Sequence, residues 1–390
     1  MGDVTMTIRI EGEVAPGFEA VADAFARGFE GRAGMGAALA IRVDGDYVAR
    51  LWAGTADPRT GRPWQAETPG VIFSCTKGVM ALLVARLVEQ GLLDYDAPVA
   101  RYWPEFAAAG KGAITVREAL AHRAGLLALE RDFSVDELCD WETMVTAIAA
   151  QRPLFEPDSG YAYHPLTHGW LTGELVRRVT GRMPGAYLRE EITGPLGADL
   201  WIGIPETVEP AHLDVVAPDP ATQPVLPPPP EPNWPERAVS FGGALPLSLA
   251  TPTGGMNDRR LVAAELPGAG GVATADGLAT FWSAAVTRTE GLRTLGPDVV
   301  ERATREVSGG PGIYSGVPPW YRWGMGFMLD AEARRLLTER SFGHDGAGGQ
   351  VAFADPEYRA GFAYITNRME SRPDPRGNAV VAALRDILSR

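Results

Sequence analysis

Ser74 and Lys77, three residues apart, are the pair in this sequence best suited to covalent chemistry. Of the 36 basic residues, only Lys77 and Lys111 are lysines, and all the others are arginines. An amine can lose a proton, whereas a guanidinium effectively cannot. A serine hydroxyl becomes a good nucleophile when a base takes its proton, and a lysine can do so when burial or nearby positive charge lowers its pKa. The pair therefore predicts a nucleophile and its base.

The hydrophobic pattern places Ser74 at the start of a helix. Apolar residues recur at helical spacing from Val79 to Val88, and the pattern stops near Gly91. Residues three apart are neighbours on a helix surface, so the amine of Lys77 can reach the hydroxyl. The helix dipole also favours negative charge developing at this end. Because Ser-x-x-Lys alone is a weak pattern, a capping serine followed by a surface lysine is the alternative.

Three runs of sequence around this pair carry a family resemblance. They are residues 73–78 (FSCTKG), 87–99 (LVEQGLLDYDAPV) and 115–126 (TVREALAHRAGL). Together they resemble the serine β-lactamase-like family, most closely the family VIII carboxylesterases, which share the fold of class C β-lactamases and penicillin-binding proteins. The resemblance extends from about residue 18 to the C-terminus and is interrupted only by a proline-rich segment. It implies that Ser74 is the nucleophile and Lys77 its partner.

A tyrosine is the second element that the resemblance implies. The run 156–165 (EPDSGYAYHP) resembles the family segment that ends in Tyr-x-Asn, which places the catalytic tyrosine at Tyr163, with Tyr161 as the alternative. Its hydroxyl would relay the serine proton and later protonate the leaving alkoxide. Both tyrosines could instead be core aromatics. Since Pro165 stands where the family has asparagine, we expect His164 as a substitute contact to substrate.

The third family element, Lys-Thr-Gly on the strand that borders the site, corresponds here to His344, Asp345 and Gly346. The resemblance makes these three residues the expected substrate-binding strand. Asp345 would place an anion near the carboxylate of a β-lactam, so we expect weak β-lactamase activity and a preference for neutral esters. The N–H groups of Ser74 and Ala347 would form the oxyanion hole. A tight turn that leads into an edge strand is the plainer interpretation of the glycines here.

The hydrophobic patterns of the segments that must position these residues predict an α/β fold of the α+β type. Helical spacing occurs in residues 16–29, 135–150, 167–180 and 378–388, and strand patterns in 37–41, 47–52, 321–329, 350–354 and 360–367. Strands at both chain ends predict an antiparallel sheet flanked by helices, with a mostly helical insertion and the active site between the two parts. The expected domains are residues 1–74 with 270–390, and residues 75–269. The proline-rich segment 217–235 is read as a rigid loop rather than a docking motif.

Composition excludes several other classes of protein. The net charge of −13 argues against nucleic acid or an anionic membrane as partner. No apolar run approaches the length of a membrane span, and residues 1–6 do not resemble a secretory signal. Cys75 and Cys139 form no disulfide framework, although Cys75 lies inside the candidate site. These features predict a cytoplasmic protein, and its oligomeric state stays open.

No cofactor is expected. His164 and His168 are spaced to share a helix face, but a third metal ligand is not evident. Residues 268–273 (GAGGVA) satisfy the G-x-G-x-x-A dinucleotide pattern, yet Leu266 and Pro267 precede them instead of an apolar strand. A tight turn that enters a helix is therefore favoured. The G-x-S-x-G elbow of the α/β-hydrolases is absent.

Taken together, these residues predict a serine hydrolase that cleaves small carboxylic esters through an acyl-enzyme on Ser74, with Lys77 and Tyr163 moving the proton. An acyltransferase, a hydrolase of amides or β-lactams, and a non-catalytic binding protein with the same fold are the alternatives. Replacement of Lys77 by arginine should leave a folded protein that has lost most of its activity, whereas replacement of Lys111, in a glycine-flanked loop, should be nearly silent.

Overall fold

A large antiparallel sheet forms the scaffold of the computed structural model, which describes residues 8–216, 232–314, 317–370 and 374–390. In this part of the chain the sheet has nine strands in the order β1-β3-β2-β13-β12-β11-β10-β9, and β4 pairs with β3. The strands are β1 (Glu11–Val14), β2 (Gly36–Val43), β3 (Asp46–Asp57), β4 (Arg62–Pro63), β9 (Arg322–Trp323), β10 (Met328–Leu329), β11 (Phe342–Asp345), β12 (Val351–Asp355) and β13 (Ala360–Thr366). Strands from both chain ends meet where β2 pairs with β13, which confirms the predicted antiparallel sheet.

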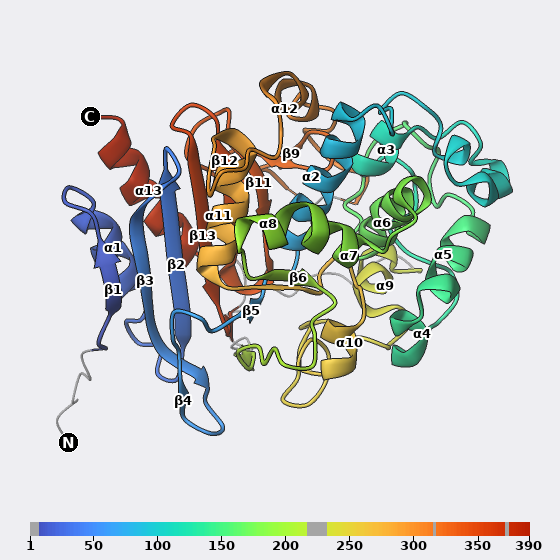
Figure 1. Ribbon diagram of the computed structural model, residues 1–390. Coiled ribbons are helices and arrows are strands. Elements are labelled where there is room, and N and C mark those ends of the chain that lie inside the picture. The colour runs from blue at the N-terminus through green and yellow to red at the C-terminus, as the bar shows by residue number, and fades with distance from the viewer. Residues whose placement is uncertain (1–7, 217–231, 315–316, 371–373) are drawn as a thin grey trace.

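Helices cover both faces of this sheet. On one face α1 (Glu19–Arg27) packs beside α13 (Arg376–Leu388), and on the other α11 (Ala275–Val286) crosses β2, β12 and β13 (Figure 1). Alternating residues of β2 serve the two layers: Leu39 and Ile41 join the core under α1 and α13, whereas Ala38 and Ala40 join the core that contains α11. Because both faces are covered, β2 is buried along nearly its whole length.

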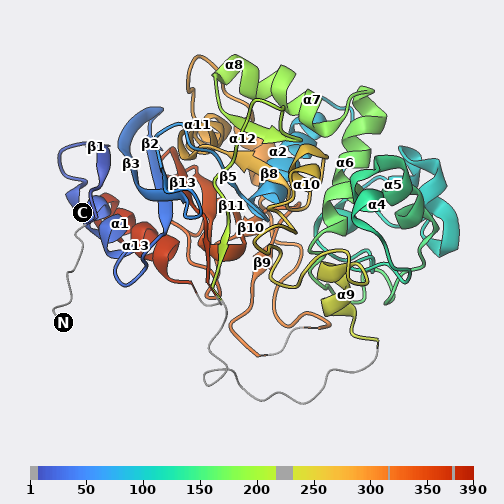
Figure 2. The same ribbon diagram turned by 90° about the horizontal axis from the view of Figure 1, so that it is seen from below.

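Most of the remaining helices form a separate group, which Figure 2 shows on the far side of β9–β11 from α1. The α-helices not yet named, most of which belong to this group, are α2 (Cys75–Glu89), α3 (Val116–Leu120), α4 (Val135–Cys139), α5 (Trp141–Ala150), α6 (Thr167–Thr180), α7 (Pro184–Leu188), α8 (Gly194–Leu196), α9 (Trp234–Ser240), α10 (Arg259–Ala263) and α12 (Pro297–Ala303). A three-stranded sheet of β5 (Gly70–Val71), β8 (Gly271–Ala273) and β6 (Leu200–Ile202) joins this group to the rest, and β7 (Asp214–Val215) pairs with β14 (Arg368–Met369). The domain boundaries at residues 74 and 270 remain a prediction.

Three expectations for local structure need correction. Residues 135–150 form two helices, because the Asp140 side chain accepts a hydrogen bond from the Thr143 N–H and starts a new helix there. The expected strand 321–329 is two short strands that pair with each other, β9 and β10. Of the proline-rich segment, residues 217–231 lie outside the described part, while Trp234 and Pro235 open α9, where proline is tolerated in the first turn.

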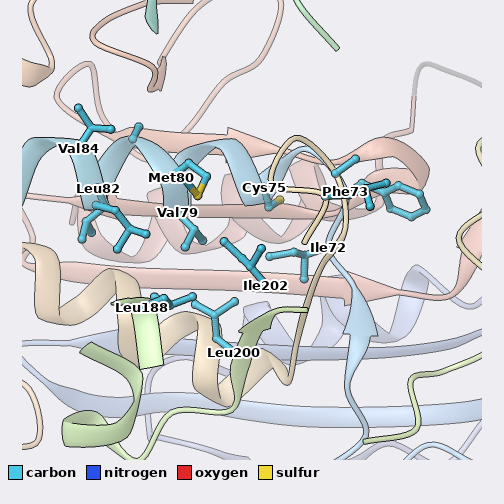
Figure 3. Packing of buried hydrophobic residues seen from close by; sticks show 14 of the residues in the cluster. Ile72, Phe73, Cys75, Val79, Met80, Leu82, Val84, Leu188, Leu200 and Ile202 are labelled. Carbon is cyan, nitrogen blue, oxygen red and sulfur yellow. The ribbon is translucent and has the colours of Figure 1, made fainter. Parts of the chain in front are cut away.

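Helix α2 is buried between the large sheet and the helical group. Its apolar side chains belong to the larger core cluster, and Figure 3 shows Val79 and Leu82 of this helix together with Leu188, Leu200 and Ile202 of the same cluster. An apolar helix of this kind is enclosed by protein all round. Within the described residues, no helix is long and apolar enough to cross a membrane.

A glycine sets how closely α2 approaches the sheet. A Cβ added to Gly78 would lie 2.9 Å from Trp282 of α11 and 3.2 Å from the Gly343 carbonyl carbon of β11. No larger side chain fits at this position without displacing backbone or a buried indole ring. The beginning of α2 is thereby held against β11.

Candidate active site

The turn before α2 positions Ser74 so that its hydroxyl does not cap the helix. Phe73 is fully buried and adopts a left-handed backbone (φ 46°), which costs a non-glycine residue about 1–2 kcal/mol. The Thr76 hydroxyl donates to the Phe73 carbonyl oxygen and accepts from the Gly271 N–H, so the turn is tied to β8. Ser74 occupies the N-cap position, as expected, but its side chain makes no capping hydrogen bond.

Ser74, Lys77 and Tyr163 meet at one hydroxyl. The Lys77 Nζ donates to Ser74 Oγ at 3.0 Å, and the Tyr163 hydroxyl donates to the same oxygen at 3.0 Å. Lys77 is fully buried, whereas Ser74 and Tyr163 are partly exposed. A reactant could therefore reach the hydroxyls of the serine and the tyrosine, while the amine is shielded from solvent.

Lys77 forms a second hydrogen bond, to a residue that the sequence analysis did not assign to the site. Its Nζ also donates to the Gly268 carbonyl oxygen at 2.7 Å. That carbonyl is close because glycines meet there: a Cβ added to Gly169 of α6 would lie 2.0 Å from the Gly268 nitrogen. A Cβ on Gly268 itself would lie 2.5 Å from the Leu166 carbonyl oxygen. The glycine-rich run 268–273 was the available signal, but its contact is 191 residues from Lys77 in sequence.

The other lysine is buried as well. Lys111 is fully buried, and its Nζ donates to the carbonyl oxygens of Ala108, Ala149 and Gln151 at 2.8, 2.8 and 2.6 Å. The last two carbonyls belong to the C-terminal end of α5, where helix carbonyls lack intrahelical partners. Burial lowers the pKa of this amine to about 8. Lys111 is thus a buried residue that ties three carbonyl groups together. That its replacement by arginine leaves activity nearly unchanged stays a prediction.

Two rings hold the Tyr163 ring in place. The indole of Trp323 stacks on it at 5.3 Å between centroids, and the imidazole of His122 meets it edge-on at 4.9 Å. Tyr161, the alternative to Tyr163, is turned elsewhere: its hydroxyl donates to the Gly310 carbonyl oxygen at 2.6 Å. Of the two tyrosines, Tyr163 is the one that hydrogen-bonds to Ser74.

The His164 side chain bonds to backbone groups in the protein interior and is not available to a substrate. Its ring is fully buried, with Nε2 accepting from the Leu126 N–H at 3.0 Å and Nδ1 facing the Ala162 carbonyl oxygen at 2.5 Å. Both nitrogens are thus used by the backbone of neighbouring loops. The expectation that His164 compensates for the asparagine replaced by Pro165 does not agree with this position.

The residues of β11 lie on opposite faces of the sheet, because successive side chains of a strand alternate. The His344 ring is on the Tyr163 side, 6.0 Å from the Tyr163 ring and 5.3 Å from that of Trp323. Asp345 points to the other face, where Arg334 donates to its carboxylate at 2.7 Å. Asp345 is buried and neutralised by this ion pair. The same carboxylate lies 3.6 Å from the His344 Nδ1. Because Arg334 balances its charge, the repulsion expected between Asp345 and a β-lactam carboxylate is weakened, and the preference for neutral esters stays a prediction.

The end of β11 lies next to the turn before Ser74. A Cβ added to Gly346 would lie 2.5 Å from the Ile72 carbonyl oxygen, so this residue permits a close approach of the two backbones. Ala347 follows at the start of a short 3₁₀ turn, Ala347–Gly349, and is partly exposed. In the described part of the chain, the N–H groups of Ser74 and Ala347 donate to no backbone oxygen outside their own helical turns. Helix-start N–H groups are suited to holding a negative oxygen.

The groups packed behind the site are uncharged near neutral pH. Burial lowers the pKa of His164 to about 4, and it lowers the pKa values of His122, His168 and His344 as well. Burial also raises the pKa of the Cys75 thiol, whose Sγ lies 3.2 Å from the His344 carbonyl oxygen, so this cysteine is not poised to react. No set of three or more His, Cys, Asp or Glu side chains suited to a metal ion occurs among the described residues.

Known proteins similar to this chain share its fold over nearly the whole length. The family model described as Beta-lactamase matches residues 21–386. The esterase/beta-lactamase LipL of Mycobacterium tuberculosis is 36% identical over 376 residues, which cover 93% of this chain and 84% of that protein. A solved penicillin-binding protein homolog from Caulobacter crescentus is 37% identical, with a TM-score of 0.84 over 97% of this chain and all of that one. A solved family VIII carboxylesterase is 34% identical, with the same TM-score and the same shares covered.

Proposed function

Because the chain belongs to the beta-lactamase family, we propose that it is a serine hydrolase that cleaves carboxylic esters of small acyl groups through an acyl-enzyme on Ser74. The observation that carries this proposal is the meeting of the Lys77 amine and the Tyr163 hydroxyl at Ser74 Oγ, each at 3.0 Å. A hydroxyl flanked by two groups able to exchange protons is the arrangement that nucleophilic catalysis requires.

The reaction begins when Ser74 Oγ attacks the ester carbonyl carbon and passes its proton to Lys77 or Tyr163. The tetrahedral intermediate collapses, the bond to the alcohol oxygen breaks, and that oxygen takes a proton from the same pair. Water then attacks the acyl-serine, and the carboxylic acid leaves as the serine regains its proton. Both proton carriers lie within hydrogen-bonding distance of Oγ, so the transfer of the serine proton in either direction is short.

Two backbone N–H groups complete the machinery. We assign the oxyanion hole to the N–H groups of Ser74, at the start of α2, and of Ala347, in the short turn after β11. The close approach of Gly346 to the Ile72 carbonyl oxygen brings these two segments together. Donors aimed at the developing negative oxygen typically contribute about 10²–10³ in rate. They require no metal and no organic cofactor.

The charge of the site favours a neutral ester. His344 stands where the family has the lysine of Lys-Thr-Gly, and burial lowers the pKa of its imidazole below the ordinary value. An uncharged imidazole offers no cation to a substrate carboxylate, in contrast to lysine. His344, rather than Asp345, thus accounts for the preference, because the Asp345 carboxylate is paired with Arg334.

Hydrolysis of p-nitrophenyl acetate and butyrate, measured beside that of a chromogenic cephalosporin, tests the proposal. We expect ester turnover that disappears in Ser74→Ala and slow or absent ring opening of the cephalosporin. Absence of ester turnover by the pure protein would refute the esterase proposal. Rapid cephalosporin hydrolysis would instead favour a β-lactamase, as the name of the LipL relative allows. Acyl transfer to added alcohols in preference to water would favour an acyltransferase.

A further inference from the structure

His122 is tied to both residues that flank Tyr163. Its carbonyl oxygen accepts from the Ala162 N–H at 3.0 Å, and its Nδ1 accepts from the His164 N–H at 3.2 Å. One residue thus fixes the backbone immediately before and immediately after Tyr163.

The His122 ring also packs on the side chain that it flanks. It meets the Tyr163 ring edge-on at 4.9 Å between centroids, and it meets the Trp323 ring at 4.8 Å and 84°. Trp323 in turn stacks on Tyr163. The tyrosine ring therefore has two neighbours that also contact each other, so a swing of the ring would have to displace both.

The backbone of His122 is held in an uncommon conformation. Its φ is +64°, in the left-handed region, which costs a non-glycine residue about 1–3 kcal/mol. Neighbouring contacts sustain it: the Ala121 carbonyl accepts from the Ser308 hydroxyl at 2.8 Å, and the Arg123 N–H donates to the Glu118 carbonyl at 2.8 Å. This conformation lets the carbonyl and the ring of a single residue reach Ala162 and His164 at the same time.

The protonation state of the ring follows from its partner. Because the His164 N–H donates to Nδ1, the neutral ring carries its proton on Nε2. The ring is fully buried, and the groups that face it are His168 and His164, His344, the Lys77 amine and Tyr163. Most of these groups would repel a charged imidazole if they were protonated themselves, and burial adds to the cost.

We propose that His122 is a positioning residue that holds the Tyr163 hydroxyl on Ser74 by fixing the backbone on both sides of the tyrosine, an inference that rests on the proposed catalytic role of Tyr163. His122 does not reach a substrate, since its side chain is fully buried. Its contribution is to the orientation of the proton carrier, and a misplacement of about 1 Å in such a group can cost about 10²-fold in rate.

Two replacements separate this role from simple packing. His122→Asn keeps an acceptor at the same number of bonds from Cβ as Nδ1 and suits a left-handed backbone. His122→Gly suits the same backbone but removes both the acceptor and the ring. His168→Leu is the matched control, because His168 is equally buried, lies 4.7 Å from the His122 ring, and bonds to the Leu120 carbonyl.

For p-nitrophenyl butyrate we expect His122→Gly to lower kcat about 10- to 100-fold with little change in KM. His122→Asn should retain kcat within about threefold, and His168→Leu should lower the melting temperature without a comparable loss of kcat. In a Tyr163→Phe background, His122→Gly should lower kcat no further, because both changes remove the same function.

Each remaining outcome overturns the inference. If His122→Gly and His168→Leu are folded and lose kcat equally, the cluster acts only through packing. If His122→Gly is folded and fully active, or impairs Tyr163→Phe further by the same factor, the link to Tyr163 is wrong. If Tyr163→Phe itself retains wild-type kcat, the proposed function of Tyr163 fails first, and the role of His122 fails with it.

Discussion

Acid should unfold this protein over a narrow pH range, because its interior holds several neutral histidines. His122, His164 and His168 are fully buried, and their folded-state pKa values lie below the ordinary 6.5, at about 4 for His164. The unfolded chain therefore binds more protons than the folded protein below pH 6.5. Their contribution to stability is complete above that pH and is lost as the pH falls.

The size of the effect follows from counting protons between pH 6 and pH 5. The three histidines take up about three protons on unfolding, and His344 and His212, whose pKa values are also lowered, act in the same direction. Glu265 opposes them, because burial raises its pKa to about 7 and the folded protein holds its proton in this range. A net uptake of about two protons corresponds to about 3 kcal/mol per pH unit. That is a large part of the 5–15 kcal/mol that stabilises an ordinary domain.

Urea unfolding at pH values from 7.5 to 5, followed by circular dichroism and tryptophan fluorescence, measures this slope. We expect the free energy of unfolding to be nearly constant between pH 7 and pH 7.5 and to fall steeply below pH 6.5. In His168→Leu, which has one fewer titrating histidine, the slope should be shallower by about 1.4 kcal/mol per pH unit. A stability that is flat or rising from pH 6.5 to pH 5 would show that these histidines are not buried in neutral form.

Three substitutions test the buried contacts of α2 and α5. Lys77→Arg retains charge but cannot act as a base, so kcat/KM for p-nitrophenyl butyrate should fall by about 10²–10⁴ in protein that is folded by circular dichroism; near-normal turnover would contradict this role. Lys111→Arg should lower stability in urea unfolding by about 1–3 kcal/mol, because a larger head group must replace an ammonium bound to three carbonyls, while kcat stays unchanged. Gly78→Ala should destabilise by about 1–3 kcal/mol, since its Cβ would lie 2.9 Å from Trp282; a melting temperature equal to that of the wild type would show that α2 can move away from the sheet.

Features with local causes were predictable from the sequence. The apolar spacing of residues 167–180 predicted α6 with both ends as observed, and the strand patterns at 37–41 and 47–52 predicted the paired strands β2 and β3. The break at Asp140 was also local but was missed, because the side-chain cap that begins α5 interrupts an apolar pattern that continues across it. A closer examination of capping residues inside long periodic segments would have found it.

Features that depend on distant contacts were not predictable. The family motifs brought Ser74, Lys77 and Tyr163 to the same site, yet no pattern indicates that the Gly268 carbonyl receives the Lys77 amine. The sequence also did not indicate to which face of the sheet the Asp345 side chain points. Both faces of β11 are covered, so all its residues are buried and no alternation of polar and apolar residues marks the faces. Its partner Arg334 shows the direction only after folding.

Mass spectrometry of the protein after reaction with an alkyl phosphonate or a slowly released acyl ester tests the central claim most directly. We predict one adduct per chain, on the peptide that contains Ser74, with labelling greatly slowed in Lys77→Arg and Tyr163→Phe. An adduct on any other residue, or equally fast labelling of Ser74 in both variants, would contradict the proposal that these three side chains form the catalytic machinery.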